Sequence, residues 1–513
     1  MGNKIFEIKL KPGYSDDELE RKIGKLSGIK SPEYFLIKKS LDARKKDNLY
    51  YNIRVCVKSD NYKTEEFQLP PILQIPKKGK KRKVTIVGLG PAGFFSAYIL
   101  QLAGFDVTII EQGRDVRNRV KDITKFENER VLDEKSNYSF GEGGAGTFSD
   151  GKLTSRTKTI DLERNFIYDT FIKAGAPEEI LYLTHPHLGT DQLRLMSEKM
   201  RSLFEDVGGK ILFSTTFEDF LEIEKSITKV FINSGDIETD FLILATGHSN
   251  YNTYSRMIKR GVPFRVKPFA IGMRAEHERE IINRAQWGVD NLPDFKAAEY
   301  RLTAQVRDNA SVFSFCMCPG GKIVPVTPYK DTNIVNGMSV YKRNAPFSNA
   351  AVVAPVDLRK ILGEKCDPLH AIEWLHQLEK KFYTYTNSFD IPAIRIDDFL
   401  KSGKSSGKLN KSSFPFGLKP MESLEIMPDF VVDDLKLGLN IFCQKLKGYE
   451  NGMLLGLESK TSSPIQVIRN SNGKVEGFNN LYYCGEGSGY SGGIISSAAD
   501  GIKTAMTILN LKA

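Results

Sequence analysis

The feature that most constrains this chain is the segment VTIVGLGPAGFFSAYILQLAGFDVTIIEQG, which begins at Val84. Its first residues form an apolar run typical of a parallel strand buried on both faces. Glycines at G-x-G-x-x-G spacing follow at Gly88, Gly90 and Gly93. They allow a tight turn, a close approach of backbone to a diphosphate, and close packing of helix on strand. Phe95, Ile99 and Leu102 then predict the buried stripe of that helix.

The second strand of this unit, DVTII, ends at Glu111, 23 residues after Gly88. A carboxylate at this point is placed to accept both ribose hydroxyls of an adenosine and repels a 2′-phosphate. The diphosphate would meet the free N–H groups at the start of the helix, where Pro91 and Ala92 lie. The segment therefore predicts a site for FAD or NAD rather than NADP.

A second glycine-rich segment, GEGGAG, matches the same spacing but lacks its context. NYSF before it is a poor strand, and TFSDGKLTSR after it is no amphipathic helix. Adjacent glycines favour backbone that passes close to a flat ligand or an anion, and a plain loop is the alternative. The candidate cofactor contacts here are Gly141, Gly143, Gly144 and Gly146, with Asp150 and Lys152 just beyond them.

Two later segments favour FAD over NAD. LILATGHS is a strand that ends in a turn of small residues, Thr246 and Gly247, where backbone can lie close to a nucleotide. LYYCGEGSGYSGG places Gly485 and Glu486 at a strand end, where the carboxylate can accept a hydrogen bond from a ribityl chain. The helix that opens at Gly492-Gly493 would turn its N-terminus toward the flavin edge that becomes negative on reduction.

The remaining patterns predict an α/β protein: a Rossmann-type FAD-binding domain with an inserted strand-rich α+β substrate domain and a small N-terminal βαββ module. We expect boundaries at 1–75 for the module, 76–260 for the first part of the FAD-binding domain, 261–430 for the substrate domain and 431–513 for the return.

The net charge of +10 is concentrated in one place. Six of these charges lie in KKGKKRK, at Lys77, Lys78, Lys80, Lys81, Arg82 and Lys83. A mild excess over the rest of the chain is not a nucleic-acid footprint, so the run is interpreted as a solvated linker, with a phosphate-binding patch or targeting signal as the alternative. Six scattered cysteines and six histidines predict neither a disulfide framework nor a metal centre.

These segments, in this order, resemble the glutathione-reductase-type superfamily of two-dinucleotide-binding-domain flavoproteins. The closer resemblance is to a bacterial family of uncharacterised FAD-dependent dehydrogenases, also labelled NAD- or FAD-utilising. It spans nearly the whole chain and rests on the N-terminal module and on FGEGGAGTFSDGKL, HPHLGTDQL, SFCMCPGG, ESKTSSPI and CGEGSGYSGGIISSAADGIK. The chain departs from the common superfamily pattern at Glu486, where aspartate is usual.

The resemblance implies an oxidoreductase with an FAD site, and it adds Arg119, eight residues after Glu111, as a residue near the diphosphate. The full predicted cofactor-binding set is Gly88, Gly90, Pro91, Ala92, Gly93, Glu111, Gln112, Arg119, Gly141, Gly143, Gly144, Gly146, Asp150, Lys152, Thr246, Gly247, Gly485, Glu486, Gly493 and Ile494. There is no C-x-x-C or C-x₄-C pair and no second nucleotide fingerprint, so NADH or NADPH would visit only transiently.

Catalytic residues are not identified by any motif. His248, Cys316 and His185 are weak candidates, each with a structural role as the stronger alternative. Cys316 and Cys318 form a C-x-C pair that would share a strand face, either as reactive thiols or as small buried hydrophobes. Glu458 and Lys460 either bound the substrate pocket or lie at the surface.

We therefore expect an FAD-dependent oxidoreductase that transfers hydride through flavin N5 to or from a small molecule. An RNA-modifying flavoprotein and a flavin-binding redox sensor without turnover are the alternatives. With no signal-peptide pattern and no continuous apolar span, the chain is expected to be cytoplasmic, with no membrane partner.

Overall fold

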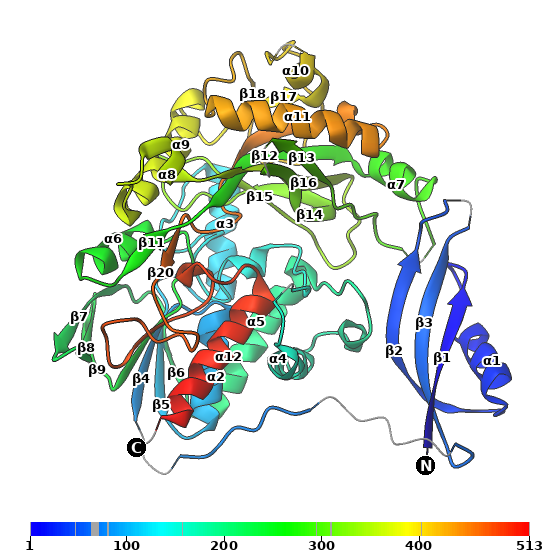
Figure 1. The fold of residues 1–513 in the computed structure, drawn as a ribbon, viewed down its shortest axis with the longest axis horizontal. Helices are drawn as coiled ribbons and strands as arrows, with labels where there is room; N and C mark the ends of the chain where they lie inside the picture. The colour runs from blue at the N-terminus through cyan, green and yellow to red at the C-terminus, as the bar shows by residue number, and fades with distance from the viewer. Residues whose placement is uncertain are drawn as a thin grey trace.

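A computed structural model describes residues 2–46, 48–62, 71–78, 82–155, 157–293, 295–307, 310–401 and 403–511. The described residues form an N-terminal module, a unit built on a parallel sheet, and a strand-rich unit above it (Figure 1). We call the last two the parallel-sheet unit and the strand-rich unit. The predicted α/β class with a parallel sheet is confirmed.

The N-terminal module has the expected βαββ order. It contains β1 (Gly2–Leu10), α1 (Asp16–Ser27), β2 (Glu33–Asp42) and β3 (Tyr50–Ser59), with an antiparallel sheet in the order β1-β3-β2. Ser15 caps α1 by accepting a hydrogen bond from Glu18 N, and Leu19 and Ile23 are the buried positions of that helix. The module is tied to the parallel-sheet unit through Lys39, whose N–H donates to Tyr182 O over 2.7 Å.

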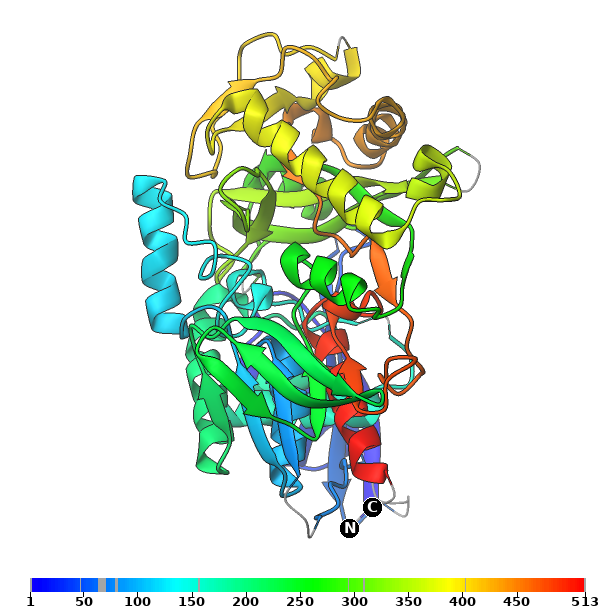
Figure 2. The same ribbon diagram turned by 90° about the vertical axis from the view of Figure 1, so that its left-hand side faces the viewer.

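The parallel-sheet unit carries strands in the order β21-β10-β4-β5-β6, and every neighbouring pair in this order is parallel. Helices α2 and α12 pack together on one face, and the antiparallel sheet β7-β8-β9 lies over the other (Figure 2). The bounds are β4 (Lys83–Val87), α2 (Pro91–Leu102), β5 (Asp106–Ile110), β6 (Lys210–Leu212), β7 (Phe217–Ile223), β8 (Ser226–Ile232), β9 (Gly235–Glu238), β10 (Phe241–Leu244), β21 (Leu481–Tyr483) and α12 (Ile494–Asn510).

Alternation along the strands explains these two layers. Ile86 and Ile243 pack in the cluster that contains α2 and α12, whereas Leu242 and Leu244 pack with the β7-β8 hairpin. Helix α2 is buried on nearly all sides, from Ala92 to Leu100, so its buried surface is wider than the predicted stripe. The reason is that α12 packs directly onto it.

The connections of this unit are mostly helical. They are α3 (Val116–Glu129), the short 3-10 helix η1 (Ala145–Phe148), α4 (Asp161–Lys173), η2 (Glu178–Leu181), α5 (Gly189–Asp206), α6 (Tyr251–Lys259) and η4 (Glu486–Ser488). In the basic run, Lys77 Nζ donates to Leu102 O over 2.6 Å and Lys83 pairs with Glu238 at 2.7 Å. Lys80 and Lys81 lie outside the described residues.

The strand-rich unit is a largely antiparallel sheet in the order β13-β14-β16-β12-β19-β17-β18, with β15 paired to β14. Its strands are β12 (Phe269–Glu278), β13 (Thr303–Arg307), β14 (Ala310–Pro325), β15 (Val335–Met338), β16 (Phe347–Val356), β17 (Ile391–Arg395), β18 (Leu418–Pro420) and β19 (Met453–Glu458). Its helices are α7 (Arg279–Trp287), α8 (Leu358–Leu362), α9 (Pro368–Thr386), α10 (Ile396–Lys401), α11 (Asp429–Lys445) and η3 (Tyr449–Asn451).

The boundary expected at 430/431 does not coincide with the sheet pairing in the structure. Strand β19 pairs with β12 and β17, and α11 packs on β13 and β16, so the chain stays in the strand-rich unit until Glu458. It returns at β20 (Ile465–Val467), which pairs with β11 (Phe264–Val266), so entry and exit of the inserted unit lie side by side. The helical pattern near 431 gave no sign of which sheet the helix covers.

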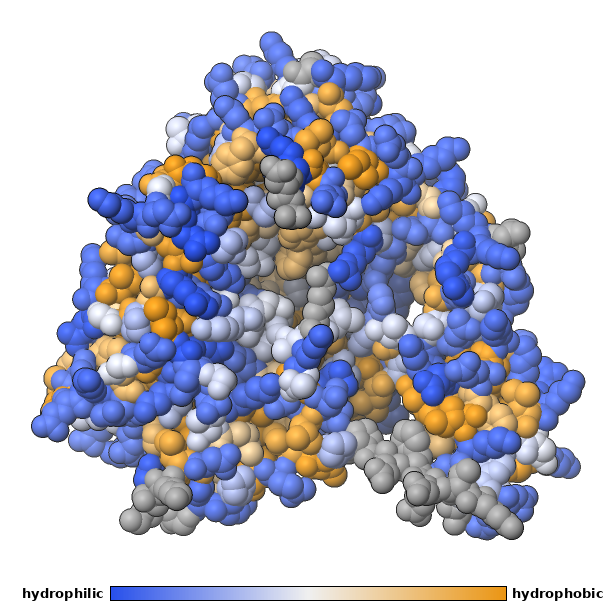
Figure 3. Space-filling model, in the orientation of Figure 1, coloured by the Kyte–Doolittle hydropathy of each residue, from blue (hydrophilic) through white to orange (hydrophobic). Residues whose placement is uncertain are grey.

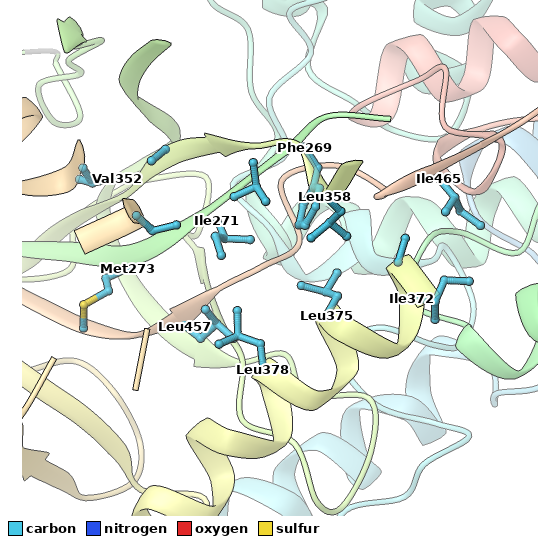
Figure 4. Close-up of a cluster of buried hydrophobic side chains, with 14 of the residues drawn as sticks. Phe269, Ile271, Met273, Val352, Leu358, Ile372, Leu375, Leu378, Leu457 and Ile465 are labelled. Atoms are coloured by element: carbon cyan, nitrogen blue, oxygen red, sulfur yellow. The ribbon is translucent and has the colours of Figure 1, made fainter. Parts of the chain in front are cut away.

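Helix α9 seals the core of the strand-rich unit. Its apolar residues Ile372, Leu375 and Leu378 face Ile271 and Leu457 of the central strands (Figure 4). The same cluster continues into β10 and α6 of the parallel-sheet unit. The two units therefore share one hydrophobic core. In the described part of the chain, no helix combines the length and apolar character needed to cross a membrane.

Candidate functional site

The glycine turn after β4 has the geometry that a diphosphate-binding turn requires. Gly88 has φ +103°, and a Cβ on Gly93 would lie 1.9 Å from Gly88 O, so neither position accepts a side chain. At Gly90 a Cβ would find only Gly144 Cα, at 3.8 Å. A side chain at Gly90 would therefore clash with no protein atom, and the space beside this residue is open to a ligand. It is also the N-cap of α2, with no side-chain cap and with Pro91 in the first turn, so the N–H groups there are available to an anion.

Glu111 is buried at the end of β5 and ties three loops together. Its Oε2 accepts from Leu89 N at 2.8 Å, and its Oε1 accepts from Gly113 N at 2.9 Å and Gly141 N at 3.2 Å. A carboxylate offers about four lone-pair sites, so room for about one further donor remains. The geometry thus fits one ribose hydroxyl better than the two that we expected. The neighbouring Gln112 accepts from Asn250 Nδ2 at 3.4 Å.

Arg119 braces the glycine-rich loop and is fully buried beneath it. All three of its guanidinium nitrogens donate to backbone carbonyls, those of Asn137, Tyr138, Gly141, Glu142 and Gly144. Burial lowers the pKa of Arg119 to about 10, and Glu111 and Glu142 oppose that shift. The donors of Arg119 are taken by the carbonyls of the glycine-rich loop and the residues before it, so its role in this structure is to hold that loop in place.

The other two predicted strand ends, those of β10 and β21, lie next to the turn. A Cβ on Gly485 would lie 2.7 Å from Ala92 Cβ, and Thr246 Oγ1 lies 3.1 Å from Tyr483 Oη. At Gly247, as at Gly493, a Cβ would meet nothing within 4 Å. Open space therefore adjoins Gly247, which follows β10, and Gly493, which precedes α12.

Glu486 and His248 form a pair at this edge. Glu486 Oε2 lies 3.1 Å from His248 Nδ1, and Glu486 Oε1 accepts from Gly493 N at 2.5 Å. Burial disfavours ionisation of Glu486, but these hydrogen bonds outweigh it and lower its pKa. Within the described part of the chain, buried His248 Nε2 has no hydrogen-bond partner, so it is a polar atom for which a ligand would supply one.

Asp150 and Lys152 belong to a buried ionic network at the junction with the strand-rich unit. Arg343 binds Asp150 through Nε at 2.9 Å and Nη2 at 2.6 Å, and Ser339 also donates to that carboxylate. Lys152 Nζ lies 2.7 Å from Asp150 Oδ2 and donates to Met317 O. These contacts hold the glycine-rich segment against the sheet, so a direct phosphate contact is not needed to explain either residue.

The two histidines of HPHLGTDQL, His185 and His187, have different partners. The His185 side chain is 69% exposed and pairs with Glu299 at 3.3 Å. The hydrogen bond to Glu299 raises the pKa of His185, and partial desolvation of the ring opposes this shift. His187 is buried, and its Nε2 atom forms a hydrogen bond with Tyr341 O. Burial, together with the positive charge of Arg343, lowers the pKa of His187 to about 3. Glu458 and Lys460 are both buried, which excludes the surface alternative.

A cavity adjoins the glycine turn. It is lined by Gly90 and Pro91, by Gly143 and Gly146 of the glycine-rich loop, and by apolar side chains of α2, α4 and α5. The face shown in Figure 3 is hollowed between the units. Among the described residues, no group of three or more His, Cys, Asp and Glu is arranged to hold a metal ion.

Sequence reasoning missed two arginines buried in the strand-rich unit, Arg274 on β12 and Arg343 between β15 and β16. Arg274 binds Glu458 at 2.7 Å, and Arg343 binds Asp150, in both cases with almost complete burial. The signal was present for Arg274, which interrupts the otherwise apolar run FAIGMRA. Buried charges are retained only when they are paired, so such an interruption predicts a partner.

Comparison with known proteins agrees with this architecture. Residues 268–461 match the family "FAD-dependent protein, C-terminal domain-like", and residues 3–58 match a domain of unknown function. The chain is 36% identical to an uncharacterised protein of Clostridium beijerinckii over 99% of both chains. It therefore belongs to the family of that protein. The match to the FAD-dependent C-terminal domain family covers most of the strand-rich unit.

Solved structures show only a distant likeness. Glycine oxidase from Bacillus cereus is 11% identical, with a TM-score of 0.38 over 84% of this chain and 96% of that one. L-proline dehydrogenase from P. horikoshii is 12% identical, with a TM-score of 0.33 over 84% of this chain and 94% of that one. TM-scores this low support no conclusion about the chemistry of this chain.

Proposed function

We propose that the chain is an FAD-dependent oxidoreductase that acts on a small molecule. The observation that carries the proposal is convergence: the Gly88–Gly93 turn, Glu111, Gly247 and Glu486 all lie at the carboxyl ends of parallel strands, around open space. Ligands of open α/β sheets bind at this edge. When bound there, a flavin supplies two-electron transfer at its N5 atom.

Each part of this edge has a role that follows from its geometry. The first turn of α2 offers N–H groups to the diphosphate, and Glu111 accepts a ribose hydroxyl. Glu486 has lone pairs left for the ribityl chain after binding Gly493 N and His248. The start of α12 at Ile494 places positive dipole beside the flavin edge that gains negative charge. His248 Nε2 then meets the ligand.

The proposed electron partner is NADH or NADPH bound transiently. The predicted division into a module, a discontinuous FAD-binding domain and an inserted substrate domain belongs to the same proposal, with the return moved to about residue 460. The substrate would enter between the inserted unit and the strand ends.

The test uses two glycine variants with opposite structural consequences. Gly90→Ala adds a methyl group that meets no protein atom closer than 3.8 Å, at a residue with φ −82°. We expect its thermal stability without cofactor to be unchanged but its affinity for FAD to fall about tenfold or more, because the methyl group keeps the diphosphate from the backbone. Gly93→Ala, whose Cβ would lie 1.9 Å from Gly88 O, should lower stability as well.

The first measurement is the absorption spectrum of the purified protein, followed by FAD titration of the stripped protein. A colourless protein that takes up no FAD, or equal FAD affinity in wild type and Gly90→Ala, rejects the proposal. Anaerobic addition of NADH and of NADPH then separates an enzyme from a sensor. Bleaching of the flavin at a catalytically useful rate supports turnover and rejects the sensor alternative, and absence of bleaching with either donor rejects NADH and NADPH as the electron partner.

A further inference from the structure

Two thiols meet on β14, where the strand-rich sheet touches the glycine-rich segment. Cys318 is fully buried and Cys316 is partly exposed. Cys318 Sγ lies 3.4 Å from Cys316 O. The strand does not simply alternate here, because its register against β16 shifts between Phe315 and Cys318, and Cys316 has φ +44°. At this bulge Cys316 is partly exposed and Cys318 is buried.

Fixed positive charge surrounds the pair. Arg274 Nη2 donates to Cys316 O at 2.6 Å and lies 3.4 Å from Cys318 Sγ. Lys152 donates to the carbonyl of Met317, the residue between the two cysteines. The Cys318 thiol, with Lys152 and Arg274, lowers the pKa of Cys316 to about 5 against the opposing effects of burial and Asp150. Cys318 keeps its proton, since its pKa is raised by Cys316 and by burial.

A proton acceptor lies in the same cluster. Glu458 is 1% exposed and binds Arg274 through Oε2 at 2.7 Å. In the described part of the chain its buried Oε1 atom has no hydrogen-bond partner. Burial raises the pKa of Glu458 to about 7, with Arg274 opposing and Cys316 adding to the shift. A buried acceptor without a donor is costly, which points to a proton that is held there at some stage.

The other cysteines lack this environment. Cys56 and Cys484 are buried, and the pKa of each is raised by burial. Cys366 and Cys443 are partly exposed, but burial and nearby carboxylates raise the pKa of both. Exposure alone therefore does not distinguish Cys316. The combination of an exposed thiol, a buried second thiol, two cations and a free acceptor does.

We propose that Cys316 and Cys318 form a thiol–disulfide exchange site that accepts low-molecular-weight disulfides. The Cys316 thiolate attacks one sulfur of the disulfide, forms a mixed disulfide and releases the first thiolate. Cys318 then attacks Cys316 Sγ, forms the Cys316–Cys318 disulfide and releases the second thiolate, while the Cys318 proton passes to Glu458. The pair loses two electrons and the small disulfide gains them. Two small thiols reverse the sequence.

This inference goes beyond the proposed flavin function and does not depend on it. Arg274 and Lys152 stabilise the attacking thiolate, and the bulge places both sulfurs on residues that are two apart in a bent strand. Residues two apart are within the Cα separation that a disulfide allows once the strand is not fully extended.

The first experiment measures alkylation of the full-length protein by iodoacetamide, with the modified site located by peptide mass spectrometry. At pH 6 a thiol with a pKa of about 5 has roughly 300 times the thiolate fraction of an ordinary thiol, and its lower nucleophilicity offsets about 40-fold of that. We expect Cys316 to react about tenfold faster than Cys366. Lys152→Met should shift the pH midpoint of Cys316 upward. Equal rates at Cys316 and Cys366 would overturn the proposal.

The second experiment uses bis(2-hydroxyethyl) disulfide on the same protein. The wild type should release two thiol equivalents and gain a Cys316–Cys318 link, which dithiothreitol removes. Cys318→Ser should release one equivalent and retain a mixed disulfide on Cys316. Cys366→Ser, a matched control at another partly exposed cysteine, should behave as wild type. If the wild type stops at the mixed disulfide, Cys318 is not a resolving thiol and the inference fails, whatever the flavin result.

Discussion

At the scale of single residues, Arg119 offers the sharpest test of how the cofactor loop is built. From a fully buried position on α3, its guanidinium donates hydrogen bonds to the backbone carbonyls of five loop residues. Lysine keeps the charge but cannot reproduce the planar set of donors. We expect Arg119→Lys to lower the free energy of unfolding by about 3 kcal/mol, because buried carbonyls lose their donors. FAD affinity should fall with it. Urea denaturation and FAD titration measure the two effects.

The same helix supplies the control for that prediction. Arg117 is two residues away, its side chain is 75% exposed, and it pairs with Glu198 at 2.7 Å. Arg117→Lys should change stability by less than about 0.5 kcal/mol. If Arg119→Lys is equally mild, the loop does not depend on this brace and the structural role assigned to Arg119 is wrong.

Buried histidine gives a prediction on pH. His277 is 2% exposed, its Nε2 bonds to Tyr449 O at 2.8 Å, and burial lowers its pKa to about 4. In the unfolded chain this histidine becomes protonated near pH 6.5, whereas in the folded chain it stays neutral until the pH approaches 4. The free energy of unfolding therefore falls as the pH drops from about 6.5 toward 4. At pH 5 the loss from this residue is about 2 kcal/mol.

Denaturation of wild type and His277→Gln at pH 7 and pH 5 checks the sign and the size. Glutamine can donate to Tyr449 O but does not titrate, so the variant should lose less stability on acidification. An equal pH 7 to pH 5 difference in both proteins would show that His277 does not contribute.

The sequence predicted the role of single residues where the backbone geometry of a position allows only one residue type. Gly88 and Gly93 are forced to be glycine by contacts that the strand–turn–helix pattern already implies. It did not work for Arg343, which stands in the polar stretch YKRNAP and meets Asp150 only through folding. No local spacing encodes a partner 193 residues away.

At the scale of elements, periodicity predicted the strands and the helix around the glycine turn, but it did not predict helices such as α4 and α5 or which sheet an element joins. The predicted strand ends at Gly88, Glu111, Thr246 and Gly485 do meet at one edge, because parallel strands in one sheet present their carboxyl ends together. Helix α11 and strand β19 were placed in the wrong unit, because an amphipathic helix shows that it covers a sheet without showing which one. The bulge at Cys316 was also invisible, since alternation predicts a regular strand.

At the scale of the whole molecule, the shared core predicts how the chain unfolds. One apolar cluster runs from β10 and α6 of the parallel-sheet unit through β12 and α9 of the strand-rich unit. The inserted unit is also joined by two adjacent crossings at β11 and β20. Separating the units would expose that core to water, so we expect them to unfold together in urea.

The chain's two tryptophans make this measurable, because Trp287 and Trp374 both lie in the strand-rich unit. Their fluorescence should change at the same urea concentration as the far-UV ellipticity of the whole chain. In a second protein, Trp287→Phe and Trp374→Phe remove these probes and Tyr168→Trp places one on α4 of the parallel-sheet unit. The three substitutions can change the stability of this variant, so its far-UV ellipticity is measured as well. The midpoint of its fluorescence transition should equal the midpoint of its ellipticity transition. Two separated transitions within either protein would mean that the apolar continuity between the units contributes little, and that the strand-rich unit folds as an independent insert.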